Sequence, residues 1–363
     1  MTENHTPESV APEWQQAGRV LCVRLDTLGD VLMTTPAIRA LKESLPGSEI
    51  TLLTSPRGAE AARFIPEIDA VEVYEAPWMK ASPAQPNSQY DLAMLDRLRG
   101  RFDAAVIFTV FSQNPLPAAM ACYLADIPLR LAHCRENPYH LLTHWVKEFE
   151  PEQMVRHEAR RQLDLVASIG CYTQDERLSF KVPEADRACA AEKLRQAGID
   201  LSRPWIVVHP GVTAPSRQYA PEGYAEAARR LVQEDAMQIV FTGSEPERGL
   251  VQQIQDWMQA PSVSLAGELT LGELGGVLEQ APLLLANNTG PVHIAAALGT
   301  PVVDLYALTN PQHTPWRVAN RVLNHDVPCK YCYQSVCPLG HHNCLRLVSP
   351  DEVVGAVREL LAV

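Results

Sequence analysis

The stretch RVLCVRLDTLGDVLMTTPAI, at Arg19–Ile38, decides the fold of this chain. It opens with an apolar run of strand length that ends at Leu25, and it continues into a tight turn that contains Gly29. From 31 to 45 the apolar residues recur at helical spacing, and Pro46 then stops the helix. A strand that passes through a glycine turn into a helix is the first step of a parallel α/β sheet.

The same alternation continues along the rest of the chain. Further strands are expected at 50–53, 71–74, 104–108, 205–208, 238–242, 262–265, 283–286 and 302–306, and further helices at 157–169, 184–197, 221–234, 246–258, 271–279 and 291–298. This pattern predicts two Rossmann-like, doubly wound α/β domains. Because ligands bind at the carboxyl ends of the strands in such sheets, we expect the chemistry in a cleft where the two sheets face each other.

The length of 363 residues fits two domains. We expect a disordered tail at 1–17, an N-terminal domain at 18–175 and a C-terminal domain at 176–349. A last helix at 350–363 could pack back on the N-terminal domain.

The composition excludes several classes of protein. A net charge of −12 repels a nucleic-acid backbone, and the sequence contains no basic run, so no nucleic-acid partner is expected. No apolar run reaches the roughly 18–20 residues of a membrane span, and the first seventeen residues do not resemble a signal peptide. The sequence therefore predicts a cytoplasmic protein, with peripheral contact at the cytoplasmic face of the inner membrane left open.

Polar and glycine residues gather where expected strands end. In the first turn, Asp30 lies near the start of a helix, which favours anions; the alternative is that Asp30 only caps this helix. Two later clusters contain Thr213, Ser216 and Arg217, and then Asn288, Thr289, Gly290 and His293. Together these strand-end clusters predict a phosphate-binding site.

Each later cluster also has a simpler interpretation. Arg217 can bind phosphate with its planar fork, or it can be a solvated side chain in a polar connection. Thr289 and Gly290 can hold a diphosphate at a helix start, or they can be an ordinary cap and turn. A lone helical histidine such as His293 is more often a core or surface residue than a catalytic one. The GxGxxG dinucleotide fingerprint is absent from the first turn, which counts against a hydride-transfer enzyme.

Four cysteines are clustered late in the chain, at Cys329, Cys332, Cys337 and Cys344, with His325, His341 and His342 nearby. Four thiolates suit a tetrahedral Zn or Fe site, although only the opening C-x2-C has the spacing of a familiar metal knuckle. Such a site would be structural, because four thiolates leave no open coordination position. Free thiols and disulfides are the alternatives, and a reducing compartment disfavours disulfides.

At this point the motifs support a resemblance. The segment at 24–38, RLDTLGDVLMTTPAI, resembles the opening motif of the bacterial heptosyltransferases, glycosyltransferase family 9. The segments GELTLGEL at 267–274, NTGPVHIAAALGTP at 288–301 and TNP at 309–311 resemble the C-terminal signature of that family. Residues 108–117 and Thr242-Gly243 also fit, so the resemblance runs from about Arg19 to the C-terminus.

The resemblance implies a GT-B fold and an inverting transfer of heptose from an ADP-sugar to the lipopolysaccharide inner core, without a catalytic metal. The N-terminal domain would bind the acceptor and the C-terminal domain the nucleotide sugar. Asp30 would be the general base. The donor-binding residues would be Thr213, Ser216, Arg217, Gly243, Asn288, Thr289, Gly290 and His293. Asn288 departs from the aspartate that is typical of the family, and the four-cysteine cluster resembles one that only some members have.

Two other functions stay open from the sequence. The chain could be a GT-B transferase with another nucleotide-sugar donor or a protein acceptor, which the Asn288 departure and the cysteine cluster motivate. It could also be a non-catalytic protein that binds a nucleotide sugar and has kept the fold. The presence of both Asp30 and Arg217 argues against the second alternative.

Overall fold

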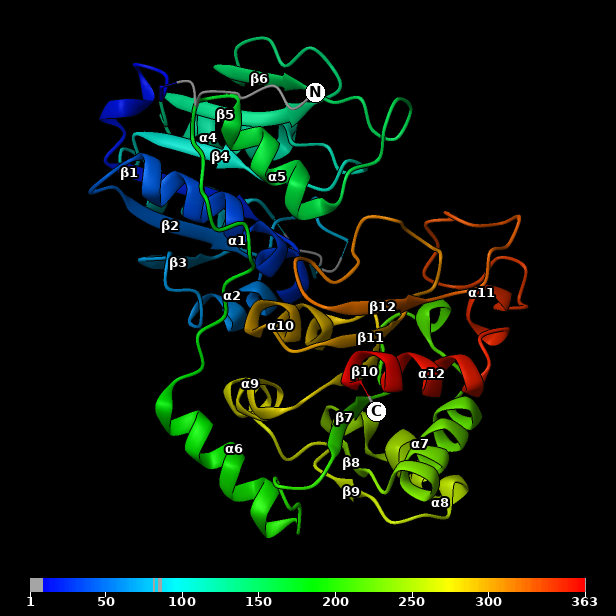
Figure 1. The fold of residues 1–363 in the computed structure, drawn as a ribbon. Coiled ribbons are helices and arrows are strands. Elements are labelled where there is room, and N and C mark those ends of the chain that lie inside the picture. The colour runs from blue at the N-terminus through cyan, green and yellow to red at the C-terminus, as the bar shows by residue number, and fades with distance from the viewer. Residues whose placement is uncertain (1–8, 81, 84–86, 363) are drawn as a thin grey trace. The chain divides into compact units, whose positions relative to one another are not determined.

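The structure is a computed structural model that describes residues 9–80, 82–83 and 87–362. The chain divides into two compact units, Met1–Ser179 and Phe180–Val363 (Figure 1). This division falls just after the boundary that the sequence predicts at 175. Each unit is built around its own parallel sheet.

The sheet of the first unit has six strands in the order β3-β2-β1-β4-β5-β6, and every neighbouring pair is parallel. The strands are β1 (Arg19–Arg24), β2 (Glu49–Thr54), β3 (Ala70–Val73), β4 (Ala104–Ile107), β5 (Leu129–Cys134) and β6 (His144–Lys147). The sequence did not predict β5 and β6. The chain order reverses next to β1, between β1 and β4, which is the position where such sheets bind ligands.

Two groups of helices accompany this sheet. The helices are α1 (Leu28–Ser44), α2 (Pro56–Ala62), α3 (Gln89–Leu98), α4 (Leu116–Leu124) and α5 (Glu158–Ala167), together with a 3-10 turn η1 (Trp14–Gln16). Helix α1 contacts α2 and α5, whereas α3 contacts α4. The alternate β1 residues Leu21 and Val23 pack with α3 and α4 in one buried cluster, because successive strand residues point to opposite faces of the sheet.

The expected disordered tail at 1–17 is corrected in part. Residues 1–8 lie outside the described residues. The rest includes Trp14, whose side chain is fully buried. Its indole Nε1 donates to His144 Nδ1 at 3.3 Å, and Ala11 N donates to the carbonyl oxygen of Ile169 at 3.0 Å. These partners lie far away in sequence, so the tail's own composition does not reveal them.

The sheet of the second unit has the order β12-β11-β10-β7-β8-β9, again with parallel pairs throughout. The strands are β7 (Trp205–His209), β8 (Gln238–Phe241), β9 (Val263–Ser264), β10 (Leu284–Asn287), β11 (Val302–Leu305) and β12 (Asn320–Leu323). Strand β12 was not expected from the sequence. The chain order reverses between β7 and β10, the equivalent of the reversal in the first sheet.

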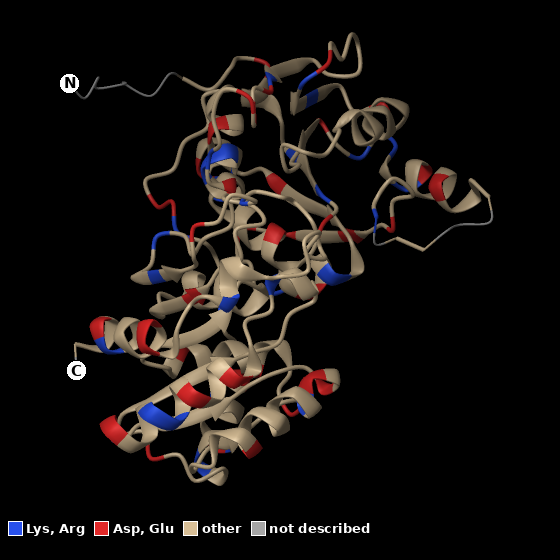
Figure 2. Cartoon of the chain, turned by 90° about the vertical axis from the view of Figure 1, so that its right-hand side faces the viewer, with Lys and Arg blue, Asp and Glu red and all other residues tan. Residues whose placement is uncertain are grey.

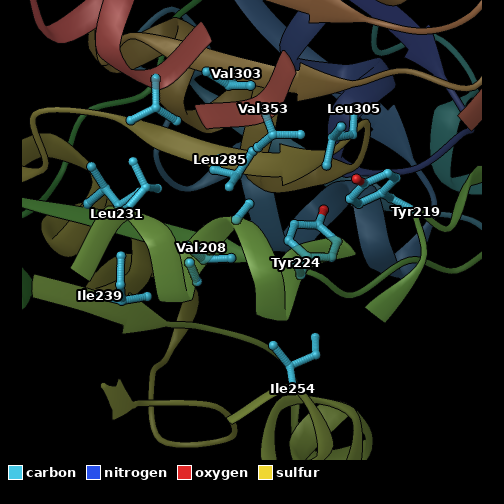
Figure 3. Packing of buried hydrophobic residues seen from close by; sticks show 14 of the residues in the cluster. Val208, Tyr219, Tyr224, Leu231, Ile239, Ile254, Leu285, Val303, Leu305 and Val353 are labelled. Atoms are coloured by element: carbon cyan, nitrogen blue, oxygen red, sulfur yellow. The ribbon is translucent and has the colours of Figure 1, made fainter. Parts of the chain in front are cut away.

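The helices of the second unit are α6 (Glu184–Gln196), α7 (Pro221–Asp235), α8 (Arg248–Met258), α9 (Leu271–Gln280), α10 (Gly290–Leu298), α11 (Asn343–Arg346) and α12 (Pro350–Leu361), with 3-10 turns η2 (Pro215–Arg217) and η3 (Glu245–Glu247). Figure 3 shows sheet residues such as Val208 and Leu285 packed against Tyr224 and Leu231 of α7 and Val353 of α12. On the other side, α9 contacts α6 and α10. Helices cover both faces of this parallel sheet because both faces carry apolar residues.

Helix α12 packs on α7, β11 and β12 of its own unit. Its N-cap is Ser349, whose side chain accepts from Glu352 N, while Glu352 accepts from Ser349 N in return. The predicted contact of this helix with the N-terminal domain stays a prediction, and Val363 lies outside the described residues.

The structure confirms the predicted pair of doubly wound α/β domains, while the predicted cleft between them stays a prediction. Figure 2 shows acidic and basic positions interspersed along the ribbons of both units. Among the described residues, no helix combines the length and the apolar character needed to cross a bilayer.

Candidate functional site

A cavity of about 610 Å³ lies in the first unit, at the carboxyl ends of β1 to β4. Its polar lining includes Asp26 after β1, Arg57 after β2, Trp78 and Lys80 after β3, and Gln113 after β4. Because the strand order is β3-β2-β1-β4, the two cationic side chains follow one side of the sheet and the carboxylate and amide follow its centre. A cavity with this lining suits a polar ligand with hydroxyl groups and an acidic group.

Asp30 lies in the first turn of α1, where it caps the helix. Its Oδ2 accepts from Thr27 N at 3.2 Å and from Thr27 Oγ1 at 2.9 Å, and its Oδ1 lies 3.2 Å from Arg24 Nη2. Asp30 therefore takes part in capping α1, and its role as the general base stays a prediction. The side chain is still 19% exposed, so its carboxylate remains within reach of a ligand at the end of β1.

A buried charge cluster surrounds the guanidinium of Arg24, the last residue of β1. Arg24 pairs with Asp26 Oδ2 at 3.1 Å, with Asp30 and with Glu158 Oε1 at 2.9 Å, and Arg24 and Glu158 are fully buried. Burial opposes the charge of Arg24, but the three carboxylates raise its pKa above the usual range. The sequence prediction missed Arg24, Asp26 and Glu158, although charged residues at the end of an apolar strand were a usable signal.

Burial also acts on Asp26. It raises the pKa of Asp26 to about 6, with further raising by the Asp30 and Glu158 charges, while Arg24 and a hydrogen bond from Gln113 act in the opposite direction. Asp26 is therefore an aspartate that titrates near neutral pH. Perturbed carboxylates of this kind gather at functional sites.

In the second unit, the predicted donor-binding residues meet at one edge of the sheet. Strands β11, β10, β7 and β8 are neighbours and parallel, so their carboxyl ends lie at the same edge. Arg217 follows β7, Gly243 follows β8, and Asn288 and Thr289 follow β10. The structure thus brings the separate sequence clusters together, with Thr213 exposed on the loop after β7.

Asn287 fixes this edge, and the sequence prediction did not include it. The side chain is fully buried at the end of β10. Its Oδ1 accepts from Tyr219 N at 3.0 Å and its Nδ2 donates to the carbonyl oxygen of Pro210 at 2.7 Å. These two bonds hold the polar loop that follows β7 against β10, which positions the segment that carries Arg217.

Asn288 is buried and is tied to β11 and to a later loop. Its Nδ2 donates to Asp304 Oδ2 at 2.9 Å and to the carbonyl oxygen of His313 at 2.8 Å. Burial raises the pKa of Asp304 to about 8, against the opposing effects of the Asn288 hydrogen bond and the positive charge of Arg217. Asp304 is thus a further acidic residue next to the predicted donor site.

Helix α10 begins at Gly290, directly after Thr289 at its N-cap. The Thr289 hydroxyl donates back to the carbonyl oxygen of Asn287 at 3.3 Å and makes no capping hydrogen bond to the helix. The positive end of α10 therefore keeps its capacity for an anion. His293 lies near the start of this helix and is buried, and its role in donor binding stays a prediction.

Ser216 has a structural partner. It is buried, its Oγ donates to the carbonyl oxygen of Gln334 at 2.8 Å, and its backbone N donates to that of Ser335 at 3.1 Å. Tyr333 N in the same cysteine-rich segment donates to the carbonyl oxygen of Thr309 at 2.8 Å. The cysteine-rich segment therefore holds the loop that carries Arg217 in place, and the hydrogen bond of the Ser216 hydroxyl contributes to this contact.

The predicted structural metal site is not supported. The four clustered cysteines line one small cavity of about 20 Å³ with His341 and His342, and Cys329 Sγ lies 3.8 Å from His341 Nε2. Within the described part of the chain, no group of three or more His, Cys, Asp or Glu side chains is arranged to hold a metal ion. A zinc–thiolate site needs its sulfur atoms about 2.3 Å from one point, and the structure does not show that arrangement among the described residues.

The geometry can now be compared with known proteins. A family model described as Glycosyltransferase family 9 (heptosyltransferase) matches residues 92–343, more than half of the chain. The chain belongs to this family. Family 9 membership confirms the predicted enzyme class, a glycosyltransferase.

Relatives and solved structures agree with the family. The chain is similar to the lipopolysaccharide core heptosyltransferase OpsX of Haemophilus influenzae, with 24% identity over 309 residues that cover 84% of this chain and 83% of the relative. It is similar to the crystal structure of a family 9 glycosyltransferase from Veillonella parvula, with a TM-score of 0.78 and 20% identity over 98% of this chain and 99% of that one. It is also similar to the ADP-heptose lipopolysaccharide heptosyltransferase II of E. coli, with a TM-score of 0.72 and 22% identity over 95% and 98%. These likenesses confirm the predicted GT-B class of fold.

Proposed function

We propose that this family 9 enzyme transfers a heptose from ADP-heptose to an acceptor in the inner core of lipopolysaccharide, with inversion at the anomeric carbon. The observation that carries the proposal is the meeting of Arg217, Asn288 and the start of α10 at one edge of the second sheet. The names of OpsX and heptosyltransferase II, both of which specify heptose transfer, support this choice of sugar.

In this proposal the second unit holds the donor. The N–H groups at Thr289 and Gly290 and the guanidinium of Arg217 bind the diphosphate, because both present positive charge to it. As the bond to the sugar breaks, negative charge grows on ADP, and the same groups stabilise it. Gly243 at the end of β8 lets the donor approach the backbone closely, and Thr213 on the loop after β7 adds a hydroxyl.

The first unit holds the acceptor in the cavity of about 610 Å³. Arg57 and Lys80 suit an acidic group of the acceptor, and the ring of Trp78 suits the apolar face of a sugar. Asp30 in the first turn of α1 accepts the proton of the attacking hydroxyl, and ADP departs from the opposite face of the anomeric carbon. The proposed displacement does not use a metal ion.

The acceptor is part of a lipid-anchored molecule, so we place the reaction in the cytoplasm, at the inner face of the membrane. The protein would contact that surface only peripherally. A flotation assay with vesicles that contain truncated lipopolysaccharide tests this placement: co-flotation supports it, and recovery of all the protein in the soluble fractions contradicts it.

The experiment that tests the function measures ADP release from a panel of nucleotide sugars, with a heptose-deficient lipopolysaccharide core as acceptor. We expect acceptor-dependent release from ADP-heptose, and a loss of about 10²–10⁴-fold in Asp30→Asn, because the amide keeps the helix cap but accepts no proton. Asp96→Asn is the matched control, since this carboxyl on α3 is 77% exposed. If the nucleoside diphosphate is released only from another nucleotide sugar, the protein is still a glycosyltransferase but its donor is not ADP-heptose. The Asn288 departure leaves this alternative open.

A further inference from the structure

Asp26 lies four positions before Asp30 on the same turn and has a different environment. Asp26 is among the residues that line the large cavity of the first unit, whereas Asp30 is not among the described residues that line it. The Asp26 side chain is only 13% exposed. The turn after β1 therefore presents two carboxylates, and Asp26 is the one that a ligand in this cavity would meet.

Three separate parts of the first unit fix the position of Asp26. Arg24 Nε lies 3.1 Å from its Oδ2, and Gln113 Nε2 in the loop after β4 donates to its Oδ1. Ser55, the N-cap of α2, donates from its hydroxyl to the backbone carbonyl of Asp26. Because Gln113 Oε1 accepts from Val110 N at 3.2 Å, the amide group of Gln113 is held with its NH₂ toward Asp26. A side chain held in this way is preorganised for a ligand.

The carboxylate keeps unused hydrogen-bonding capacity. An ionised carboxylate offers about four lone-pair positions; the hydrogen bond from Gln113 uses one, and Arg24 Nε lies 3.1 Å from Oδ2 as an ion pair without a hydrogen bond. Arg57, Glu75 and Lys80 also line the cavity, and in the cluster at Asp26 a single guanidinium, that of Arg24, faces the three carboxylates of Asp26, Asp30 and Glu158. This excess of negative charge favours a ligand group that donates hydrogen bonds, such as a sugar hydroxyl, over one that only accepts them.

We propose that Asp26 is a specificity-determining residue for the acceptor: its ionised carboxylate accepts hydrogen bonds from hydroxyl groups of the sugar that is to be glycosylated. The inference rests on the proposed function and deepens it. It separates the roles of the two aspartates, since Asp30 takes the proton of the attacking hydroxyl while Asp26 binds the acceptor in its cavity.

The pH dependence of acceptor binding follows from this role. Because burial raises the pKa of Asp26 to about 6, the carboxylate is mostly ionised at pH 7.5 and mostly protonated at pH 5. A protonated Asp26 loses acceptor capacity for hydroxyl donors. The KM for the acceptor should therefore rise as the pH falls through about 6, while the KM for the donor, which binds in the second unit, should not follow it.

The test measures kcat and both KM values between pH 5 and pH 8 for the wild type, Asp26→Asn and the exposed control Asp96→Asn. At pH 7.5 we expect the acceptor KM of Asp26→Asn to rise about 10- to 100-fold, the size of one or two hydrogen bonds to a charged group. The donor KM should stay within twofold, and the rise in acceptor KM below pH 6 should disappear in this variant. An unchanged acceptor KM, or a loss confined to kcat as a general base would give, overturns the inference.

A second measurement separates this inference from the proposed function. Calorimetric titration of the heptose-deficient core oligosaccharide into the enzyme at pH 7.5 and pH 5 needs no donor. If the wild type transfers no heptose, the proposed function fails, but weaker acceptor binding by Asp26→Asn and by the wild type at pH 5 would still support the role of Asp26. Equal binding in all cases, or no binding by the wild type, overturns that role. The pH arm uses the wild type alone, so it holds even where the variant folds poorly.

Discussion

Asn288 Nδ2 donates a hydrogen bond to Asp304 Oδ2 across 2.9 Å, which joins the end of β10 to strand β11. Both side chains are buried. The family resemblance predicts an aspartate at position 288, and in this fold that aspartate would put two carboxylates in direct contact. The chain therefore carries its acidic group at 304 and a matching amide at 288. Asn288 therefore gives Asp304 a hydrogen-bond donor where an aspartate would place a second carboxylate.

Exchanging the two side chains tests this pairing. Asn288→Asp alone should raise the donor KM by about tenfold and lower the free energy of unfolding by about 1–3 kcal/mol, because two buried carboxylates then face each other. The double variant Asn288→Asp with Asp304→Asn restores one acid and one amide, and it should recover most of both losses. Denaturant unfolding and donor kinetics on the four proteins measure the coupling, and simple addition of the two single effects would contradict the pairing.

Asp304 should also shape the dependence of stability on pH. Burial raises its pKa from the ordinary 3.8 to about 8, so between these values the folded protein holds a proton that the unfolded chain releases. This contribution to the free energy of unfolding is complete below about pH 4 and is lost as the pH rises toward 8, by at most about 1.4 kcal/mol per pH unit. Urea unfolding of Asp304→Asn should lack this decline, and parallel curves for the variant and the wild type would refute it.

Removal of Arg24 should be strongly destabilising. Arg24→Met leaves Asp26, Asp30 and the buried Glu158 without their shared cation, and we expect the free energy of unfolding to fall by about 3–5 kcal/mol. The control lies on the same strand: Arg19→Ala breaks a pair with Asp103 whose side chains are 50% and 36% exposed, and it should cost less than about 1 kcal/mol. If the double variant Arg24→Met with Glu158→Gln regains part of the lost free energy of unfolding, unpaired charge is the cause. Equal losses in Arg24→Met and Arg19→Ala would exclude this explanation.

Arg217 should contribute to nucleotide binding without a large effect on stability. Arg217→Ala should weaken ADP binding by about 10- to 100-fold in calorimetry, because a charge-assisted hydrogen bond to phosphate is lost. Arg217→Lys keeps the charge without the planar fork, so its affinity for ADP should lie between those of Arg217→Ala and the wild type. Arg229→Ala, on the exposed side of α7 where the arginine pairs with Glu226, is the matched control and should bind ADP normally. Normal ADP affinity in Arg217→Ala would remove this residue from the donor site.

Much of the fold could be predicted because its signals are local. The apolar run before Gly29 and the helical spacing after it gave β1 and α1, and the run at 205–208 gave β7 almost to the residue. Strands β5, β6 and β12 were missed, since each mixes polar with apolar residues. The order of the strands within a sheet is set by packing between segments that are distant in sequence, so only the structure supplied it.

The candidate site divides in the same way. Asp30, Arg217 and Thr289 were predicted because each lies in a polar segment that follows an expected strand. Asp26 needed the structure: its partner Gln113 is 87 positions away, and the cavity that Asp26 lines is formed by four strand ends.

The cysteines differ from these residues, because their spacing in the sequence is local but the relative position of their sulfur atoms depends on the tertiary structure. The sequence by itself determined two parallel α/β domains, a glycosyltransferase of family 9 and the strand ends that carry its polar residues, since periodicity, turns and motifs are properties of neighbouring residues. Only the tertiary structure decided which side chains meet: Trp14 with His144, Asp26 with Gln113, and Asn288 with Asp304. Burial also raised the pKa of Asp26 and of Asp304, because the cost of removing a carboxylate from water depends on everything that surrounds it.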